Sequence, residues 1–383
     1  MPAAVDVLVV GGGAAGLMCA IEAGKRGRRV VVLEHNPQIG RKILISGGGR
    51  CNFTNLYTRP ENYISANPHF AKSALARYHP QDFLDLVRQH RIPYHEKTLG
   101  QLFCDQSARD ITGMLETECA AAGVRIETGC AVRQVERANP FRLVTTLGGF
   151  ETESLVVATG GLSVPKVGAT SFGYDLARQF GLAVRPCRPA LVPLTLPPEA
   201  LQQFGELAGV SLPVEIRAGG VTFAEKMLFT HRGLSGPAIL QASSYWEPGT
   251  ELEIDLVPDI DVAARLQERR ADLRAVLSSL FPQRFAARWP LPHTGGPLGD
   301  RAIQTIADGL HHWRVRPAGT EGFAKAEVTA GGVDTAELSS QTFEAKKVPG
   351  LFLIGEVLDV TGQLGGFNFQ WAWASGFAAG QVV

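Results

Sequence analysis

The sequence has no excess of charge of either sign. Its 383 residues include 37 Lys and Arg and 37 Asp and Glu, so the formal net charge is zero. Such a chain lacks the general positive surface that binds polyanions, although a local basic patch would escape this count. We therefore expect a small-molecule substrate and no nucleic-acid partner, and the oligomeric state stays unknown at this point.

Cysteine motifs and long apolar runs are also missing. The six cysteines are scattered, include no Cys-x-x-Cys pair and end at Cys187, which argues against a zinc site or a disulfide framework and suits a reducing compartment. No apolar run is long enough to span a membrane, and Asp6 interrupts the apolar N-terminus, which no basic segment precedes. We expect a cytoplasmic protein without a metal site, a membrane span or a signal peptide.

Near its start the chain contains a glycine turn between an apolar run and a helix-like run. Val5–Val10 leads into Gly11-x-Gly13-x-x-Gly16, and the run Ala14–Gly27 follows. Gly11 permits a tight turn, Gly13 lets a phosphate approach the backbone, and Gly16 lets the helix pack closely on the strand. The free N–H groups and the dipole at the start of the helix favour a pyrophosphate.

A second apolar run, Arg29–Leu33, ends in an acidic residue. Glu34 follows it directly and stands 23 residues after Gly11. A carboxylate at this place accepts hydrogen bonds from both ribose hydroxyls and repels a 2′-phosphate. Together with the glycine turn it predicts a dinucleotide-binding strand–helix–strand unit; the alternative is the same unit without a ligand.

A polar, glycine-rich loop follows where an ordinary NAD dehydrogenase would continue into another strand and helix. It contains Gly40-Arg41-Lys42 and then Ser46-Gly47-Gly48-Gly49-Arg50-Cys51-Asn52. Consecutive glycines free backbone N–H groups to point at an acceptor, and the three basic residues add positive charge. We interpret the loop as a second contact with an extended cofactor, reaching from the pyrophosphate toward a flavin ring; the alternative is a flexible surface loop. Cys51 is interpreted as a packed side chain rather than a redox centre.

A buried strand in the middle of the chain ends in another glycine turn. Ser154–Ala158 is nearly all apolar and runs into Thr159-Gly160-Gly161. Such a turn brings backbone close to a ligand at the carboxyl edge of the sheet, where ligands of such folds bind.

The C-terminal stretch repeats this pattern with carboxylates. The strand-like run Gly350–Ile354 is followed by Glu356 and Asp359, then by Gly365–Asn368 and the small-residue helix Ala372–Gly380. Either carboxylate can bind ribityl hydroxyls, and the amides of the second glycine turn can stabilise negative charge on a reduced flavin. The alternative is an ordinary helix cap.

Between these motifs the composition changes at Pro186, where prolines begin to interrupt short alternating runs. We expect residues 60–122 to be mainly helical, 124–128 to be a third parallel strand, and 131–152 to form a small antiparallel meander over the sheet. The predicted organisation is a first part of an FAD-binding domain at 1–190, an inserted β domain at 191–257, a helical subdomain at 258–317, return strands of the β domain at 318–345, and a second part of the FAD-binding domain at 346–383.

The motifs GGGAAG, RKILISGGGRCN, VATGG, THRGLSGP and GEVLDVTGQLGGFNFQWAWASG, taken in this order with Glu34, resemble those of the aminoacetone-oxidase-type, BaiN-like FAD-binding family over the whole chain. The resemblance implies an α/β fold with a Rossmann-like, three-layer, glutathione-reductase-like FAD-binding domain and an inserted β-barrel-like plus helical domain. It also implies FAD contacts at Gly11, Gly13, Ala14, Ala15, Gly16, Glu34, Arg41, Lys42, Ser46, Gly47, Gly48, Gly49, Arg50, Cys51, Asn52, Val132 (main chain to adenine), Thr159, Gly160, Gly161, Gly355, Glu356, Asp359, Gly365, Gly366, Phe367 and Asn368. One departure is Gln101-Leu102-Phe103-Cys104, where many relatives have Arg-x-Phe-Pro.

These observations predict an FAD-dependent oxidoreductase that transfers a hydride at flavin N5 to or from a small organic substrate. Its flavin would be reoxidised by oxygen or would exchange electrons with NAD(P)H. Because the sequence contains no second complete nucleotide motif, we expect a nicotinamide to visit the open face of the flavin and leave. His231, Arg50 and Lys42 are the candidates for acid–base chemistry. The alternatives are an FAD-dependent RNA-modifying protein and a non-catalytic flavin-binding redox module.

Overall fold

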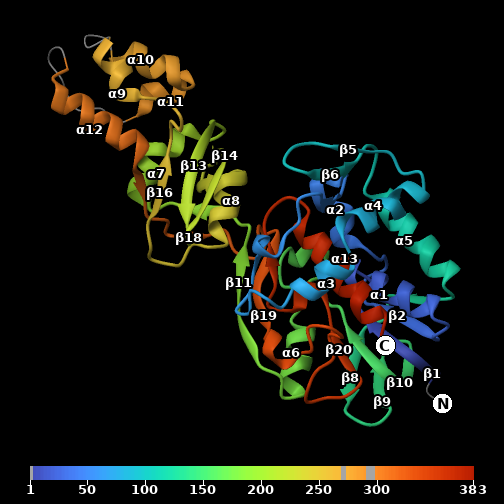
Figure 1. Cartoon of the computed structure of the whole chain (residues 1–383). Coiled ribbons are helices and arrows are strands. Elements are labelled where there is room, and N and C mark those ends of the chain that lie inside the picture. The colour runs from blue at the N-terminus through green and yellow to red at the C-terminus, as the bar shows by residue number, and fades with distance from the viewer. Residues whose placement is uncertain (1–2, 269–272, 290–297) are drawn as a thin grey trace. The chain divides into compact units, whose positions relative to one another are not determined.

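The structure is a computed structural model that describes residues 3–268, 273–289 and 298–383. It divides into two compact units, one formed by Met1–Arg188 with Val328–Val383 and the other by Pro189–Glu327 (Figure 1). Each unit has its own large sheet and its own hydrophobic core.

A seven-stranded sheet forms the centre of the first unit. Its strands are β1 (Ala3–Val10), β2 (Val30–Glu34), β7 (Arg125–Thr128), β8 (Val132–Glu136), β9 (Phe141–Thr145), β10 (Gly148–Val157) and β20 (Leu351–Leu353). They lie in the order β7–β2–β1–β10–β9–β8, and β20 also pairs with β10. The pairs β7–β2, β2–β1, β1–β10 and β10–β20 are parallel. The expected third parallel strand is therefore β7, and the carboxyl ends of the parallel strands meet at one edge of the sheet.

The meander differs from the prediction in one respect. Its last strand and the expected buried strand Ser154–Ala158 form one continuous strand, β10. The first half of β10 pairs with β9 in antiparallel fashion, and Leu155–Val157 pairs with β20 in parallel fashion. Because no glycine or proline separates the two halves, the backbone stays extended, and the meander continues the sheet rather than covering it.

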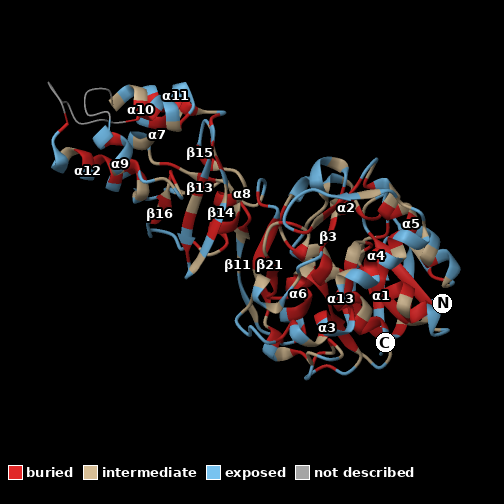
Figure 2. Cartoon of the chain, turned by 45° about the horizontal axis from the view of Figure 1, so that its top comes forward, coloured by how far each residue is buried: buried red, intermediate tan, exposed pale blue. Residues whose placement is uncertain are grey.

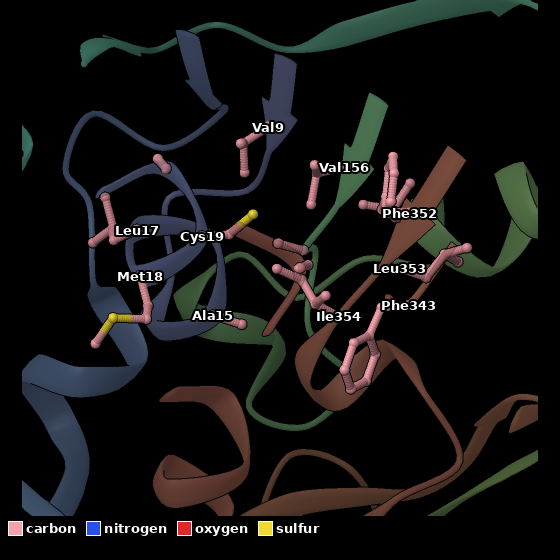
Figure 3. Close-up of a cluster of buried hydrophobic side chains, with 14 of the residues drawn as sticks. Val9, Ala15, Leu17, Met18, Cys19, Val156, Phe343, Phe352, Leu353 and Ile354 are labelled. Carbon is pink, nitrogen blue, oxygen red and sulfur yellow. The ribbon is translucent and has the colours of Figure 1, made fainter. Parts of the chain in front are cut away.

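Two helices, α1 (Ala14–Lys25) and α13 (Phe367–Gly380), pack against each other in the first unit. Figure 3 shows side chains of α1, including Leu17 and Cys19, in one cluster with Val9, Val156 and Leu353 of the sheet. Buried residues accordingly run along α1 and α13 in Figure 2. This core fixes the start of α1 beside the carboxyl ends of the strands. The other helices of the unit are α2 (Arg41–Ile45), α3 (Lys72–Arg77), α4 (Pro80–Gln89), α5 (Arg109–Ala121) and α6 (Phe172–Gln179).

The segment predicted to be mainly helical, 60–122, also contributes strands. An antiparallel sheet β3–β6–β5 is formed by β3 (Asn52–Asn55), β5 (Tyr94–Glu96) and β6 (Gln101–Cys104), and β4 (Tyr63–Ile64) pairs with β21 (Thr361–Gly362). These strands are at most four residues long, and strands that short carry too few alternations to be recognised from periodicity.

The second unit contains a seven-stranded sheet in the order β17–β16–β13–β14–β15–β12–β18. Its strands are β12 (Leu194–Thr195), β13 (Ser211–Ala218), β14 (Val221–Phe229), β15 (Gly233–Ser235), β16 (Leu252–Asp255), β17 (Trp313–Val315) and β18 (Gly319–Thr320). Its described helices are α7 (Pro198–Phe204), α8 (Pro237–Ser243), α9 (Val262–Glu268), α10 (Leu273–Leu280), α11 (Gln283–Arg288) and α12 (Asp300–His311).

The return to the first unit occurs earlier than the sequence suggested. The predicted boundary was 345, whereas the second unit ends at Glu327. The strand β19 (Val328–Val333) pairs with β11 (Val184–Ala190), and the Thr329 side chain accepts hydrogen bonds from the backbone of Leu162 and Ser163. These contacts hold Val328–Val333 in the first unit.

Candidate functional site

The glycine turn after β1 has the shape that a pyrophosphate needs. Gly11 has a φ of 114°, and a Cβ there would collide with the carbonyl oxygen of Ala158 at the end of β10. A Cβ on Gly16 would collide with the carbonyl oxygen of Gly11, so the helix lies directly on the turn. Nothing lies within 4 Å of the Cβ position of Gly13, at the start of α1. The turn is therefore closed on its strand side and open where a phosphate would approach.

Glu34 is buried at the carboxyl end of β2 and is held in place by backbone and side-chain donors. One carboxylate oxygen accepts from the N–H of Gly12 at 2.9 Å, and the other accepts from the backbone N–H and the amide of Asn36, each at 2.8 Å. Arg41 donates to the Asn36 amide oxygen at 2.9 Å. Each carboxylate oxygen can accept more than one hydrogen bond, so the fixed carboxylate keeps acceptor capacity for a ribose.

Val132 lies close in space to the carboxyl end of β2. The N–H of Cys130 donates to the carbonyl oxygen of Glu34 at 2.9 Å, and β8 begins two residues later at Val132. The structure thus brings the segment expected to reach adenine beside the carboxylate expected to bind ribose.

A charged network links the middle turn and the C-terminal turn to α2. Lys42 Nζ donates to Glu356 Oε2 at 2.7 Å and to Ser163 Oγ at 2.6 Å. Glu356 Oε1 accepts from Ser163 Oγ at 3.1 Å and from the backbone N–H of Thr329 at 2.9 Å. The network also explains Gly161, because a Cβ there would lie 2.5 Å from the Thr329 hydroxyl and 2.9 Å from Glu356 Oε1. Lys42 and Glu356 were predicted site residues, whereas Ser163 and Thr329 carried no motif signal.

The Ser46–Asn52 loop and the Gly365–Asn368 turn, which are more than 300 residues apart in the sequence, lie together. With its nitrogen directed to the carbonyl oxygen of Leu102, the Asn52 amide accepts from the N–H of Gly366 at 3.2 Å. Asn55 donates to the carbonyl oxygen of Gly365 at 2.9 Å. The two segments expected to contact the flavin thus share a single place in the fold.

The glycines of the loop have the predicted freedom. Gly47, Gly48 and Gly49 all have positive φ, between 56° and 83°, and no atom lies within 4 Å of the Cβ position of Gly48. Arg50, which follows them, is exposed. Gly48 and Gly49 therefore leave open backbone, as a bound group requires, whereas a Cβ on Gly47 would lie 2.8 Å from the ring of Phe103.

Cys51 is fully buried, and burial raises the pKa of its thiol far above the ordinary value. The N–H of Cys104 donates to the carbonyl oxygen of Arg50 at 2.9 Å, so Cys51 has near it another buried thiol, whose pKa burial raises to about 12. Thiols that stay protonated at neutral pH are poor nucleophiles, which agrees with the interpretation of Cys51 as a packed side chain.

Two predicted site residues of the first unit have side chains bonded to other parts of that unit, and a third belongs to the second unit. Asp359 accepts from the N–H of Ala66 at 3.0 Å and lies 3.5 Å from Arg185, and burial raises its pKa. The Asn368 side chain donates to and accepts from the backbone of Gly362, so it closes its own turn. His231 is exposed in the β14–β15 turn of the second unit.

These features fit FAD. The predicted contacts are the open turn at Gly13 for a pyrophosphate, the buried carboxylate of Glu34 for a ribose, and the glycine loop and the turn at Gly365 for a ring. All of them belong to the first unit. Three residues outside the predicted motifs hold these segments together through hydrogen bonds: Asn55, Ser163 and Thr329.

Comparison with known proteins identifies close relatives. The chain is 51% identical to the ribosomal RNA dihydrouridine synthase of Escherichia coli strain K12, over 98% of this chain and 97% of that protein. It is 48% identical to the protein of the same name from Haemophilus influenzae, over 97% and 96%. It is 30% identical to the 3-dehydro-bile acid delta(4,6)-reductase of Clostridium scindens, over 98% of both chains.

These names correct one prediction. The expectation of no nucleic-acid partner is contradicted by the two relatives named for ribosomal RNA. A net charge summed over 383 residues does not reveal a local basic patch, because acidic residues elsewhere in the chain cancel its charge in the sum. Neither name supports an aminoacetone substrate. In the part of the chain that the structure describes, no helix is long and apolar enough to cross a membrane.

Solved structures support the fold. A quinol-fumarate reductase with menaquinol molecules aligns with a TM-score of 0.52 and 16% identity, over 99% of this chain and 70% of that chain. The open conformation of a flavocytochrome c3 fumarate reductase aligns with a TM-score of 0.50 and 16% identity, over 99% and 78%. The family model described as the HI0933-like protein Rossmann domain matches residues 5–382. The chain therefore belongs to the HI0933-like Rossmann family of FAD-binding oxidoreductases.

Proposed function

We propose that this protein reduces a uridine of ribosomal RNA to dihydrouridine. The observation that carries the proposal is the 51% identity, over almost the full length of both chains, to a protein named for this reaction. The FAD cradle of the first unit supports it, because the uracil C5–C6 double bond is conjugated to a carbonyl and accepts a hydride. FAD, when bound, supplies the electron pair that this reduction consumes. Reduced nicotinamide is the proposed source of these electrons, and the cytoplasm the proposed location.

The chain's own part is to bind, to orient and to supply a proton. The Ser46–Asn52 loop and the Gly365–Asn368 turn would hold the ring, while Glu34 and the start of α1 would hold the nucleotide part. Among the three acid–base candidates, Lys42 is the one in the network at the cradle. Two of its Nζ hydrogens are donated to Ser163 and Glu356, and the third is available for the carbon that needs a proton.

The proposal is tested with ribosomal RNA transcribed in vitro, which contains no modified uridine. The purified yellow protein is incubated with this RNA and NADPH or NADH, and the digested RNA is analysed by mass spectrometry. We expect a uridine that has gained the mass of two hydrogen atoms. Unchanged RNA, under conditions in which the nicotinamide reduces the flavin, would refute the proposal.

Reduction of a small enone is a second candidate, favoured by the 30% identity to the bile-acid reductase. Both relatives are named for chemistry at a carbon–carbon double bond, so the cradle suits either substrate. A panel of unsaturated steroid ketones in the same assay separates them. Turnover of a steroid without any change in the RNA would favour this candidate.

A further inference from the structure

Four of the seven large hydrophobic residues that are exposed among the described residues lie on the segments around the cradle. They are Ile45, Leu56, Tyr57 and Leu99. Tyr57 and Leu99 are each 60% exposed, next to β3 and β6 respectively. An exposed tyrosine and leucine beside a ligand cradle are a candidate binding surface rather than an accident of packing.

One buried side chain holds this surface against the turn expected to face the flavin. The Asn55 amide nitrogen donates to the carbonyl oxygens of Leu99, at 3.0 Å, and of Gly365, at 2.9 Å. Its amide oxygen accepts from the N–H of Tyr57 at 2.9 Å. The Asn55 side chain therefore holds the backbone at Tyr57, Leu99 and Gly365 close together.

The ring of Tyr57 is also fixed in orientation. A Cβ on Gly100 would lie 2.7 Å from Cδ2 and 3.0 Å from Cε2 of Tyr57, so the ring packs against the backbone of Gly100. Gly100 has a φ of 76°, and its neighbour Leu99 has a φ of 51°, a conformation that a leucine rarely adopts. Strained backbone of this kind gathers at ligand-binding sites. The rest of the Tyr57 ring is free to contact a partner.

The charges near this surface suit a polyanion. Arg50, Arg59 and Lys97 are exposed on the same segments, and Lys97 Nζ lies 5.4 Å from the centre of the Phe103 ring on β6. The neighbouring carboxylate of Glu96 accepts from the N–H of Gly100 at 3.0 Å, which reduces its repulsion of a phosphate. Aromatic faces beside basic side chains are the usual surface for single-stranded nucleic acid.

We propose that Tyr57 and Leu99 form a platform on which an unpaired RNA base next to the reacting uridine stacks. This rests on the proposed function, because an enzyme that acts on a base must take it out of the helical stack and must support the neighbouring base that is exposed as a result. Tyr57 supplies the face for stacking, Leu99 supplies the apolar edge, and the basic residues contact the phosphates.

The test measures binding of a fluorescein-labelled, uridine-rich single-stranded RNA to the FAD-loaded protein by fluorescence anisotropy at constant salt. Tyr57→Ala should weaken binding roughly 5- to 150-fold, the range found for loss of one base–aromatic stack. Tyr57→Phe and Tyr57→Trp should bind within about threefold of the unchanged protein, since they keep the aromatic face.

Leu147 provides the matched control. It is 58% exposed, on the β9–β10 turn, and is not part of the cradle. Leu99→Ala should weaken RNA binding, whereas Leu147→Ala should not, and FAD absorbance and melting temperature show whether each variant is folded.

Two results would overturn the inference, and they differ in what else they refute. If the unchanged protein forms dihydrouridine but Tyr57→Ala binds RNA as tightly as Leu147→Ala does, the platform is refuted and the proposed function stands. If the unchanged protein neither binds the RNA nor changes uridine, both are refuted.

Discussion

The close packing of α1 and α13 leads to a prediction at Gly376. A Cβ at this position would lie 2.5 Å from the carbonyl oxygen of Ala15, 3.0 Å from Cβ of Met18 and 3.2 Å from the N–H nitrogen of Cys19. Two of these neighbours are backbone atoms of α1, which cannot move aside as a flexible side chain can. Gly376→Ala should therefore push the two helices apart.

The size of the effect follows from two opposing contributions. Alanine in a helix interior is more favourable than glycine by about 1 kcal/mol. Overpacking a tight core costs about 1–3 kcal/mol, and a contact with backbone belongs at the upper end, about 3 kcal/mol. The net loss is about 2 kcal/mol, which for a unit of this size corresponds to a fall of roughly 4–8 °C in melting temperature.

Gly113 in α5 is the matched control, because no atom lies within 4 Å of its Cβ position. Gly113→Ala has only the propensity gain, so it should raise the melting temperature by roughly 2–4 °C. Release of FAD on heating, followed by flavin fluorescence, reports the unfolding of the first unit. A Gly376→Ala protein that melts as high as the Gly113→Ala protein would show that the helix contact is not tight.

Three further predictions concern the cradle and its surroundings. Glu34→Gln should weaken FAD binding about 10-fold, measured by titration of the FAD-free protein, because a charge-assisted acceptor for the ribose is lost. Lys42→Met and Glu356→Gln should each lower the free energy of unfolding, measured in urea, by about 1–2 kcal/mol, a range that allows for the partial exposure of Lys42. The double variant should lose less than the sum of the two, because both changes break the same ion pair. Cys51 and Cys104 should resist alkylation by iodoacetamide at pH 8 in the native protein, measured by mass spectrometry, and rapid labelling would contradict this expectation. Because burial raises the pKa of both thiols, they ionise first in the unfolded chain, and the free energy of unfolding should fall as the pH rises from 9 toward 12.

Much of the cradle could be predicted from the sequence because its parts are local motifs. The turn at Gly11–Gly16 needs glycine for reasons that lie within a few residues, and the positive φ of Gly47–Gly49 agrees with the predicted loop. The fold class followed from these turns and the strands before them, and it is confirmed by the parallel sheet and the family match. The individual FAD contacts stay predictions.

Other features depended on contacts between distant residues. Asn55 bonds to Leu99 and Gly365, and Thr329 bonds to Ser163 and the preceding residue, but nothing near Asn55 or Thr329 in the sequence marks either role. The expectation of no nucleic-acid partner, which the two relatives named for ribosomal RNA contradict, failed for a similar reason. Charge was counted over the chain, whereas binding depends on which charges share a surface.

The sequence by itself determined the longer strands, the glycine turns and the order in which they occur, because backbone freedom and apolar periodicity are properties of neighbouring residues; the short strands between 60 and 122 escaped it. Only the tertiary structure decided which of these turns share a place, since the Ser46–Asn52 loop meets the Gly365–Asn368 turn through the packing of α1, α13 and the sheet. Hydrophobic burial drives that packing, and it acts between surfaces without regard to their separation along the chain.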